Sequence, residues 1–107
     1  MKVINRIKKN AEFNKVIDEG QVVKSDSLTL YFLENKLGYA RIGISIPRKS
    51  GNAVVRSKMR RQIRAIIASD VDLTKSIDAI LIARKQYDIG KFEKTRSDLN
   101  YLIKKVG

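Results

Sequence analysis

The segment from residue 39 to residue 69 constrains the fold more than any other part of the chain. Its first eight residues, YARIGISI, alternate with a period of two, which is typical of a β-strand with one face in the core. Pro47 ends this strand, because proline has no N–H to donate to a neighbouring strand. The residues predicted to face the core are Ala40, Ile42, Ile44 and Ile46, and those predicted to face outward are Tyr39, Arg41, Gly43 and Ser45.

A helix is predicted to follow directly, over residues 53–69. Val55, Met59, Ile63 and Ile66 recur there at helical spacing and so share one face. A helix with such an apolar stripe has to cover a sheet or another helix. A strand followed this closely by an amphipathic helix indicates an α+β fold, in which helices pack against a small mixed sheet.

The remaining segments complete that architecture. We predict helices over 10–19 and 91–106, strands over 27–33 and 78–84, and a short edge strand near 21–23. The element order is therefore α-β-β-(β)-α-β-α. A chain of 107 residues has the size of one domain, so we expect residues 1–107 to form a single domain.

The first helix carries an end signal on each side. Asn10 is the predicted N-cap, because its side chain can accept a hydrogen bond from the first turn. Gly20 is predicted to follow the last turn, the position where glycine is most often found. Between these ends Phe13, Val16 and Ile17 form an apolar stripe.

The charge of the chain predicts its partner. Lysine and arginine number 23 against 11 acids, which gives a net charge of +12 at pH 7. No acid occurs between Glu34 and Asp70, whereas an ordinary solvated surface mixes both signs. This excess favours a nucleic acid, because binding releases the counterions condensed on its phosphates. The cations of that acid-free stretch are Lys36, Arg41, Arg48, Lys49, Arg56, Lys58, Arg60, Arg61 and Arg64.

Several classes of chemistry lack their residues. The chain has no cysteine and no histidine, which excludes disulfides, thiol nucleophiles, the usual zinc sites and histidine-dependent dyads. Its acids are scattered, and phosphate-binding GxxxxGK[ST] and GxGxxG motifs are missing. We therefore expect no catalytic residue in this chain. No apolar run is long enough to span a bilayer, and the first residues do not resemble a signal peptide, so the expected location is the cytoplasm.

The predicted helix over 53–69 carries the main functional signal. Arg56, Arg60 and Arg64 recur every four residues, and like charges at that spacing repel one another by a few tenths of a kcal/mol per pair. A planar guanidinium donates two hydrogen bonds to a phosphate at once, so we predict that this arginine stripe binds nucleic acid. The preceding loop, RKSGN, adds Arg48 and Lys49 and a Gly-Asn turn expected to expose backbone amides to an anion.

A second candidate surface lies on the outward face of the predicted strands. Tyr31, Arg41 and Ser45 are placed where a base could stack on the tyrosine while the arginine holds the backbone. Ordinary surface polarity is the alternative reading. For Phe13 and Ile17, helical spacing alone favours the core over a ligand platform.

Three stretches together resemble the protein subunit of bacterial ribonuclease P over nearly the whole chain: RIKKNAEFNKVIDEG, GISIPRKSGNAVVRSKMRRQIR and DAILIARK. The central stretch is the most specific, with Gly51-Asn52-Ala53-Val54 followed by arginines on one helix. Two departures stand out. The family's Arg-Asn-Arg element reads Arg56-Ser57-Lys58, and Pro47-Arg48 replaces the usual Ser-Lys.

The resemblance implies a ferredoxin-like (ribosomal-S5-domain-2-like) fold with a left-handed βαβ crossover, although chirality rules favour a right-handed one. It implies that a catalytic RNA with bound Mg²⁺ hydrolyses precursor tRNA, while the protein binds both. The residues implied for the catalytic RNA are Asn52, Arg56, Lys58, Arg60, Arg61 and Arg64. Those implied for a cleft that receives the 5′ leader are Phe13, Ile17, Tyr31, Arg41, Ser45, Arg48 and Lys49. Ile17 stands where the family usually has an aromatic residue.

Two other functions remain open on the residues alone. A structural RNA-binding protein, such as a small ribosomal protein, has the same composition. A helix-turn-helix DNA-binding module needs a short helix just before residue 53, where ARIGISIPRK reads as a strand. We therefore expect neither DNA nor a membrane among the partners.

Overall fold

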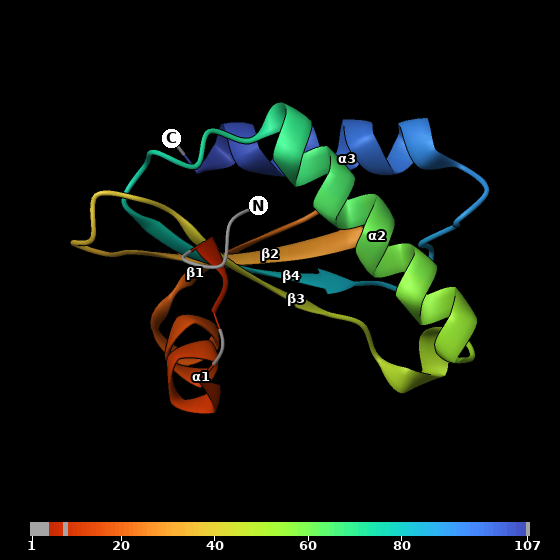
Figure 1. Cartoon of the computed structure of the whole chain (residues 1–107), viewed down its shortest axis with the longest axis horizontal. Coiled ribbons are helices and arrows are strands. Elements are labelled where there is room, and N and C mark those ends of the chain that lie inside the picture. The colour runs from red at the N-terminus through yellow and green to blue at the C-terminus, as the bar shows by residue number, and fades with distance from the viewer. Residues whose placement is uncertain (1–4, 8, 107) are drawn as a thin grey trace.

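The computed structural model describes residues 5–7 and 9–106 of the chain (Figure 1). The sheet strands are β1 (Gln21–Lys24), β2 (Leu28–Glu34), β3 (Arg41–Ser45) and β4 (Ile77–Ala83). The helices are α1 (Asn10–Glu19), α2 (Ala53–Asp70) and α3 (Phe92–Lys105), and a 3₁₀ turn over Arg48–Ser50 precedes α2. The predicted element order is confirmed, including the edge strand after the first helix.

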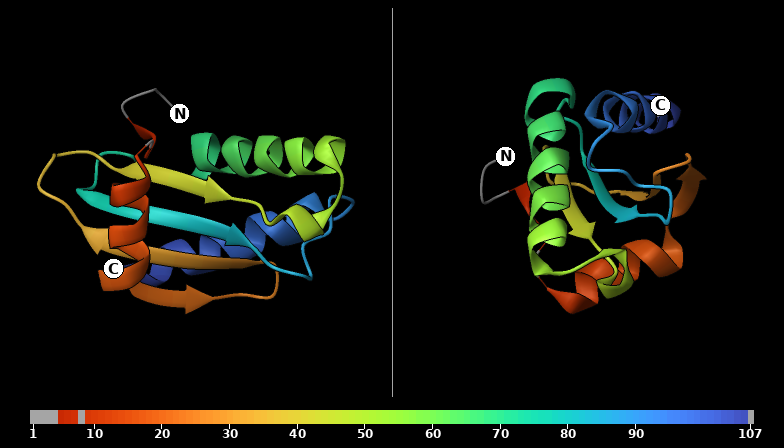
Figure 2. Two further views of the ribbon diagram at one scale, coloured as in Figure 1. Left: turned by 90° about the horizontal axis from the view of Figure 1, so that it is seen from below. Right: turned by 90° about the vertical axis from the view of Figure 1, so that its right-hand side faces the viewer.

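The strands form one four-stranded sheet in the order β1-β2-β4-β3. β1 and β4 both pair with β2 in antiparallel fashion, and β3 pairs with β4 in parallel. α1 lies on one face of the sheet, and α2 and α3 lie on the other (Figures 1 and 2). The mixed sheet with helices on it is the predicted α+β architecture.

The connection from β3 through α2 to β4 is left-handed. In the left view of Figure 2, both strands point to the right, β3 lies above β4, and α2 lies behind the sheet while α1 lies in front. A chain that follows these three elements turns in the rare sense, because nearly all such crossovers are right-handed. The expectation taken from the family resemblance is confirmed.

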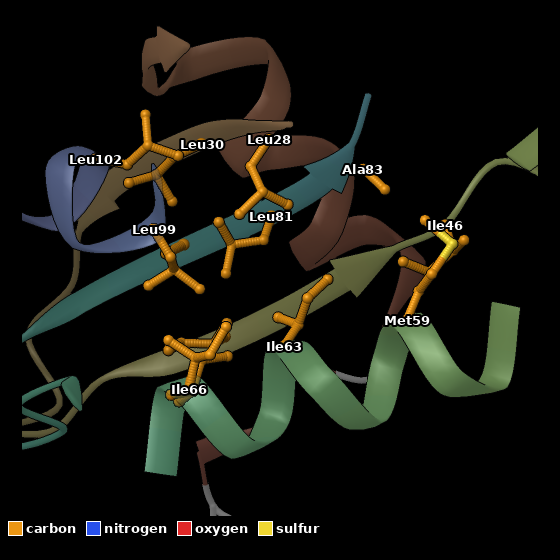
Figure 3. Close-up of a cluster of buried hydrophobic side chains, with 13 residues drawn as sticks. Leu28, Leu30, Ile46, Met59, Ile63, Ile66, Leu81, Ala83, Leu99 and Leu102 are labelled. Carbon is orange, nitrogen blue, oxygen red and sulfur yellow. The ribbon is translucent and has the colours of Figure 1, made fainter. Parts of the chain in front are cut away.

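The main core lies between the sheet and the pair α2 and α3. From α2, Met59, Ile63 and Ile66 point to the sheet, as predicted (Figure 3), and the neighbouring Ile67 is also fully buried. Each such side chain contributes roughly 1.5–3 kcal/mol by leaving water. The main core consists of Leu28, Leu30, Ile42, Ile46, Met59, Ile63, Ile66, Ile67, Ala79, Leu81, Ala83, Leu99 and Leu102.

The opposite face of the sheet holds a much smaller core under α1. Its buried residues are Ile7, Val16 and Ile80, and half-buried apolar side chains surround them. Val16 is the buried residue of α1. α1 is therefore held by far less apolar packing than α2 or α3.

The structure changes the interpretation of both residues predicted to mark the ends of α1. The N-cap is Lys9, so Asn10 begins the helix instead of capping it. Gly20 has an extended backbone with φ −79°, so no left-handed conformation calls for glycine. A Cβ at Gly20 would lie 2.4 Å from the Val16 carbonyl oxygen and 2.6 Å from that of Phe32. Glycine is needed there because two backbones come together.

The C-terminal end of α2 is tied to α3 by one carboxylate. Asp70 accepts hydrogen bonds from Arg96 Nε at 2.7 Å, Arg96 Nη2 at 2.9 Å and Asn100 Nδ2 at 2.8 Å. These donors, the arginine foremost, hold the pKa of the Asp70 carboxyl well below its usual range. This contact joins the end of α2 to α3.

Candidate nucleic-acid interface

Two of the four arginines of α2 lie beside its buried stripe, and the other two lie away from it. Arg56 and Arg60, beside the stripe, are half-buried, and Arg61 and Arg64 are exposed. Successive residues of a helix are about 100° apart, so the set covers one continuous side of α2. We call Arg56, Arg60, Arg61 and Arg64 the arginine face.

Gln62 shows which way the arginine face points. Its Nε2 donates to the Ile89 carbonyl at 2.9 Å, and its Oε1 accepts from the Tyr87 hydroxyl at 2.9 Å. This flank of α2 therefore faces the loop before α3. Arg60 and Arg64 are each two residues from Gln62, about 200° around the helix, so they project from the opposite flank. Lys58, about 40° from Gln62, is separated from most of the arginines with which it was predicted to act.

The arginine face has no acid partner within the part of the chain that the structure describes. The ion pairs there use Arg41, Lys94 and Arg96 as cations. The side-chain bond found for the face joins Arg56 Nε to the Asn52 carbonyl at a long 3.5 Å. These guanidinium groups therefore keep their donors for a ligand.

The N-terminus of α2 is built by two residues that precede it. Asn52 caps the helix, its Oδ1 accepting from the Val55 amide at 3.0 Å. Gly51 has φ +156°, and a Cβ there would lie 2.8 Å from Val55 Cγ1, so no other residue fits without strain. The amides of Ser50 and Gly51 donate to carbonyls within the turn. The predicted exposure of backbone amides to an anion is therefore wrong for Gly51.

The sheet presents three rows of side chains to the α1 side. Pairing of β2 with β4 and of β4 with β3 places Leu33, Asp78 and Arg41 in the first row. The middle row is Tyr31, Ile80 and Gly43, and the third row is Thr29, Ile82 and Ser45. α1 crosses these strands in the left view of Figure 2.

Glycine in the middle row allows α1 to lie close to β3. A Cβ at Gly43 would lie 2.9 Å from Phe13 Cε2 and 2.8 Å from Ile80 Cδ1. Gly43 faces away from the main core, as predicted, but it is buried under α1. The Phe13 ring covers it.

Half-exposed side chains gather along the flank of α1 that carries Phe13 and Ile17. Both pack around the small core together with Tyr31 and Ile82, and each remains half-buried. Ser45, beside Ile82 in the third row, is half-buried as well. The structure thus brings together four of the residues predicted for the cleft and adds Ile82, which sequence reasoning missed. We call Phe13, Ile17, Tyr31, Ser45 and Ile82 the α1-side surface.

Arg41 has a different role from the one predicted. It lies in the first row, and its Nε and Nη2 donate to the two oxygens of Asp78 at 3.0 Å and 2.7 Å, while Nη1 donates to Glu12 of α1. The bonds to Asp78 chiefly raise the pKa of the Arg41 guanidinium above its ordinary value; burial opposes them and Glu12 adds to them. Its charge is neutralised within the protein, so it is not available to hold an RNA backbone.

A basic pocket lies at the carboxyl ends of the parallel strands β3 and β4. It has a volume of about 360 Å³ and combines cations with apolar walls. Arg84 donates from Nη1 to the Ser25 carbonyl at 2.7 Å, and burial raises the pKa of the Tyr87 hydroxyl to about 12. The lining residues are Pro47, Lys49, Ser50, Met59, Ala83, Arg84, Lys85 and Tyr87.

Arg84 and Lys85 were missed from the sequence, although a signal for them existed. Both directly follow a buried strand, and parallel strands bring their carboxyl ends to one edge of a sheet. Arg48 and Lys49, in the exposed turn after β3, reach the same edge.

Two further kinds of site are missing from residues 5–7 and 9–106. No group of three or more acidic, histidine or cysteine residues there is arranged to hold a metal ion. In the same residues, no helix has the length and apolar character required to cross a bilayer.

The chain is similar to known proteins over its full length. The family model described as Ribonuclease P matches residues 1–107. A ribonuclease P protein component of Bacillus velezensis is 40% identical over 107 residues, covering 99% of this chain and 92% of the relative. One from Mesoplasma florum is 36% identical over 99 residues, covering 91% and 90%.

Solved structures agree with this similarity. The RNase P protein of Staphylococcus aureus superposes with a TM-score of 0.83 at 31% identity, covering 95% of this chain and 94% of the other. That of Thermotoga maritima gives a TM-score of 0.83 at 27% identity, covering 95% and 97%.

Proposed function

The chain belongs to the ribonuclease P protein family, and from this premise we propose that its two surfaces bind two different RNAs. Its role is that of the family: it binds RNA and serves the maturation of tRNA 5′ ends as the protein component of ribonuclease P. Its RNA partner is the RNA of that enzyme. Residues 1–107 act as one RNA-binding domain in this proposal.

The arginine face binds the catalytic RNA. The observation that carries this assignment is that four arginines lie together on one side of α2, in a stretch without acids, and that none of them forms an ion pair within the described chain. Phosphates relieve the repulsion between arginines four residues apart and accept two hydrogen bonds from each. Asn52 supports this face by capping α2, and Lys58 extends the contact on the other flank.

The α1-side surface receives the single-stranded 5′ leader of precursor tRNA. Tyr31 and Phe13 offer partly exposed rings on which bases can stack, and Ile17 and Ile82 offer apolar contact. Arg48 and Lys49 continue this surface with positive charge beyond Ser45, and the basic pocket with Arg84 and Lys85 lies at the same edge of the sheet. Arg41 stays outside this set, because its donors bind protein carboxylates.

The protein takes no chemical part in hydrolysis in this proposal. Several carboxylates that could act on a substrate are engaged in holding the fold: Asp78 by Arg41, Asp70 by Arg96, and Asp98 by the Ser27 hydroxyl at 2.6 Å. The catalytic RNA supplies the reaction through Mg²⁺ that it binds together with the substrate. The work takes place in the cytoplasm, where precursor tRNA is made in bacteria.

Reconstitution tests the function directly. The purified chain is added to a bacterial ribonuclease P RNA at a Mg²⁺ concentration where that RNA alone is nearly inactive, and cleavage of precursor tRNA is measured. We expect strong stimulation and a single product with the mature 5′ end. Absence of stimulation, with tight RNA binding retained, would favour a structural RNA-binding protein. The fold does not fit a helix-turn-helix DNA-binding module, because such a module needs a helix before α2, and β3 and a 3₁₀ turn precede α2 instead.

A further inference from the structure

Arg41 links α1 to the sheet on the flank opposite the α1-side surface. Resting on the proposed leader contact, we propose that Arg41 and Glu12 are positioning residues: their ion pair fixes α1 across the sheet and so holds Phe13 and Ile17 where the leader passes. Neither residue touches the leader. They act through the position of the helix.

Few directional contacts hold α1 on the sheet. Among the residues that the structure describes, Glu12 is the one side chain of α1 that forms a hydrogen bond or ion pair with the sheet. Apolar packing around Val16 is non-directional and lets a short helix shift or rotate. A charge-assisted hydrogen bond fixes both distance and orientation.

The sheet side of this link is rigid. Asp78 is buried, with 8% of its surface exposed, and it receives both Arg41 and Asn35 Nδ2, the latter at 2.8 Å. Asn35 also accepts from the Leu37 amide at 3.0 Å, which ties the link to the turn after β2. The Arg41 guanidinium is thus a fixed anchor that Glu12 can hold.

The two flanks of α1 have different contacts: one carries Glu12, and the other carries Phe13. Glu12 and Lys15 border a hollow of about 440 Å³ with Leu33, Arg41 and Asp78, so packing on this flank is loose. Phe13, the next residue after Glu12, lies on the other flank against Gly43. The far end of α1 is fixed by the close backbone approach at Gly20, so loss of the Glu12 bond frees the end that carries Phe13.

The charge effect and the positioning effect of a Glu12 substitution change RNA affinity in opposite directions. Glu12→Gln removes a negative charge near RNA, and by charge alone this strengthens RNA binding. Loss of position weakens leader binding instead. Glu19→Gln is the matched control, because Glu19 is an exposed acid at the end of the same helix, and no side-chain bond of the described residues involves it.

The experiment uses the complex of the full chain with ribonuclease P RNA. Affinity is measured for precursor tRNA with its leader and for the same tRNA without it, in the wild type, Glu12→Gln, Glu12→Asp and Glu19→Gln. We expect Glu12→Gln to weaken binding of leader-bearing substrate by roughly threefold to tenfold, the size of one lost hydrogen bond. Leaderless tRNA and binding of the RNA subunit should change by less than about twofold. Glu12→Asp should recover part of the loss.

The outcomes separate the inference from its premise. A Glu12→Gln complex that binds leader-bearing substrate as well as Glu19→Gln does would overturn the positioning role. Equal losses for both tRNAs and for the RNA subunit would overturn it too, since they indicate damage to the fold. A wild-type complex with no preference for the leader would refute the proposed leader contact itself.

Discussion

Two groups of arginines in this molecule differ in their surroundings. Arg41 and Arg96 each face carboxylates at 2.7 Å, and their bonds join elements far apart in the chain. The arginine face of α2 lies in a stretch without acids, and its cations form no ion pair among residues 5–7 and 9–106. The comparison teaches that the neighbouring carboxylates, more than the residue type, distinguish an arginine that stabilises the fold from one that is available to bind RNA.

The largest effect is expected from Arg41→Ala, and it should be an effect on the fold. The substitution leaves the buried Asp78 carboxylate without its main donor. We expect the free energy of unfolding to fall by about 3 kcal/mol, and the Tm by about 10 °C or more. Urea denaturation measures this change. At a temperature where the variant is folded, its affinity for the RNA subunit should match the wild type.

The converse is expected from Arg60→Ala combined with Arg64→Ala. Loss of two phosphate contacts should weaken binding of the RNA subunit by about tenfold to a hundredfold and flatten the salt dependence of the affinity. The free energy of unfolding should change by less than about 0.5 kcal/mol, because the two side chains have no partner to lose in the described structure. Titrations at several salt concentrations test this prediction. Normal RNA affinity in this variant would show that the wrong face was assigned.

A smaller effect is expected at the α1-side surface. Tyr31→Ala should reduce the preference for precursor tRNA over leaderless tRNA by about fivefold, the loss of a single stacking contact. Tyr101→Ala is the matched control, since Tyr101 is 51% exposed on α3 and lies under Lys105, away from α1. Competition between the two tRNAs measures the preference. An equal loss in both variants would remove the distinction between this surface and any exposed tyrosine.

The smallest effect is a pH dependence carried by Asp70. Its pKa is lower in the folded state than in the unfolded chain, so its contribution to stability is present above about pH 4. That contribution is lost as the pH falls through the folded-state value, when the carboxylate takes up a proton and releases Arg96. Thermal melts between pH 5 and pH 2 should therefore show a shallower loss of Tm in Asp70→Asn than in the wild type. Parallel curves would contradict this account.

Much of the fold was predictable, because the spacing of apolar residues within a short segment indicates whether that segment is a strand or a helix. The alternation in residues 39–46 and the stripe of Val55, Met59, Ile63 and Ile66 locate β3 and α2 with small errors at their ends. The arginine face follows from the same helical geometry. The left-handed crossover is different, because only the resemblance predicted it and the general chirality rule opposed it.

The rest depends on contacts between distant segments. Alternation places Arg41 on a face of the strand, but it does not show that Asp78, 37 residues away, and Glu12, 29 residues away, meet it there. The reason for Gly20 is likewise a contact, with the Phe32 carbonyl of a neighbouring strand. Arg84 and Lys85 gain their place only once β3 and β4 are known to be parallel. The spacing of apolar residues predicts which face of its element a side chain lies on, whereas its neighbours from other segments are known only once the arrangement of the strands and helices is known.

The unequal cores on the two sides of the sheet have an evolutionary consequence. Most of the buried apolar side chains belong to the main core with α2 and α3, and few belong to the small core under α1. Substitutions on the exposed side of α1 therefore endanger little of the folding free energy, so this helix can change its surface residues at little cost to the fold.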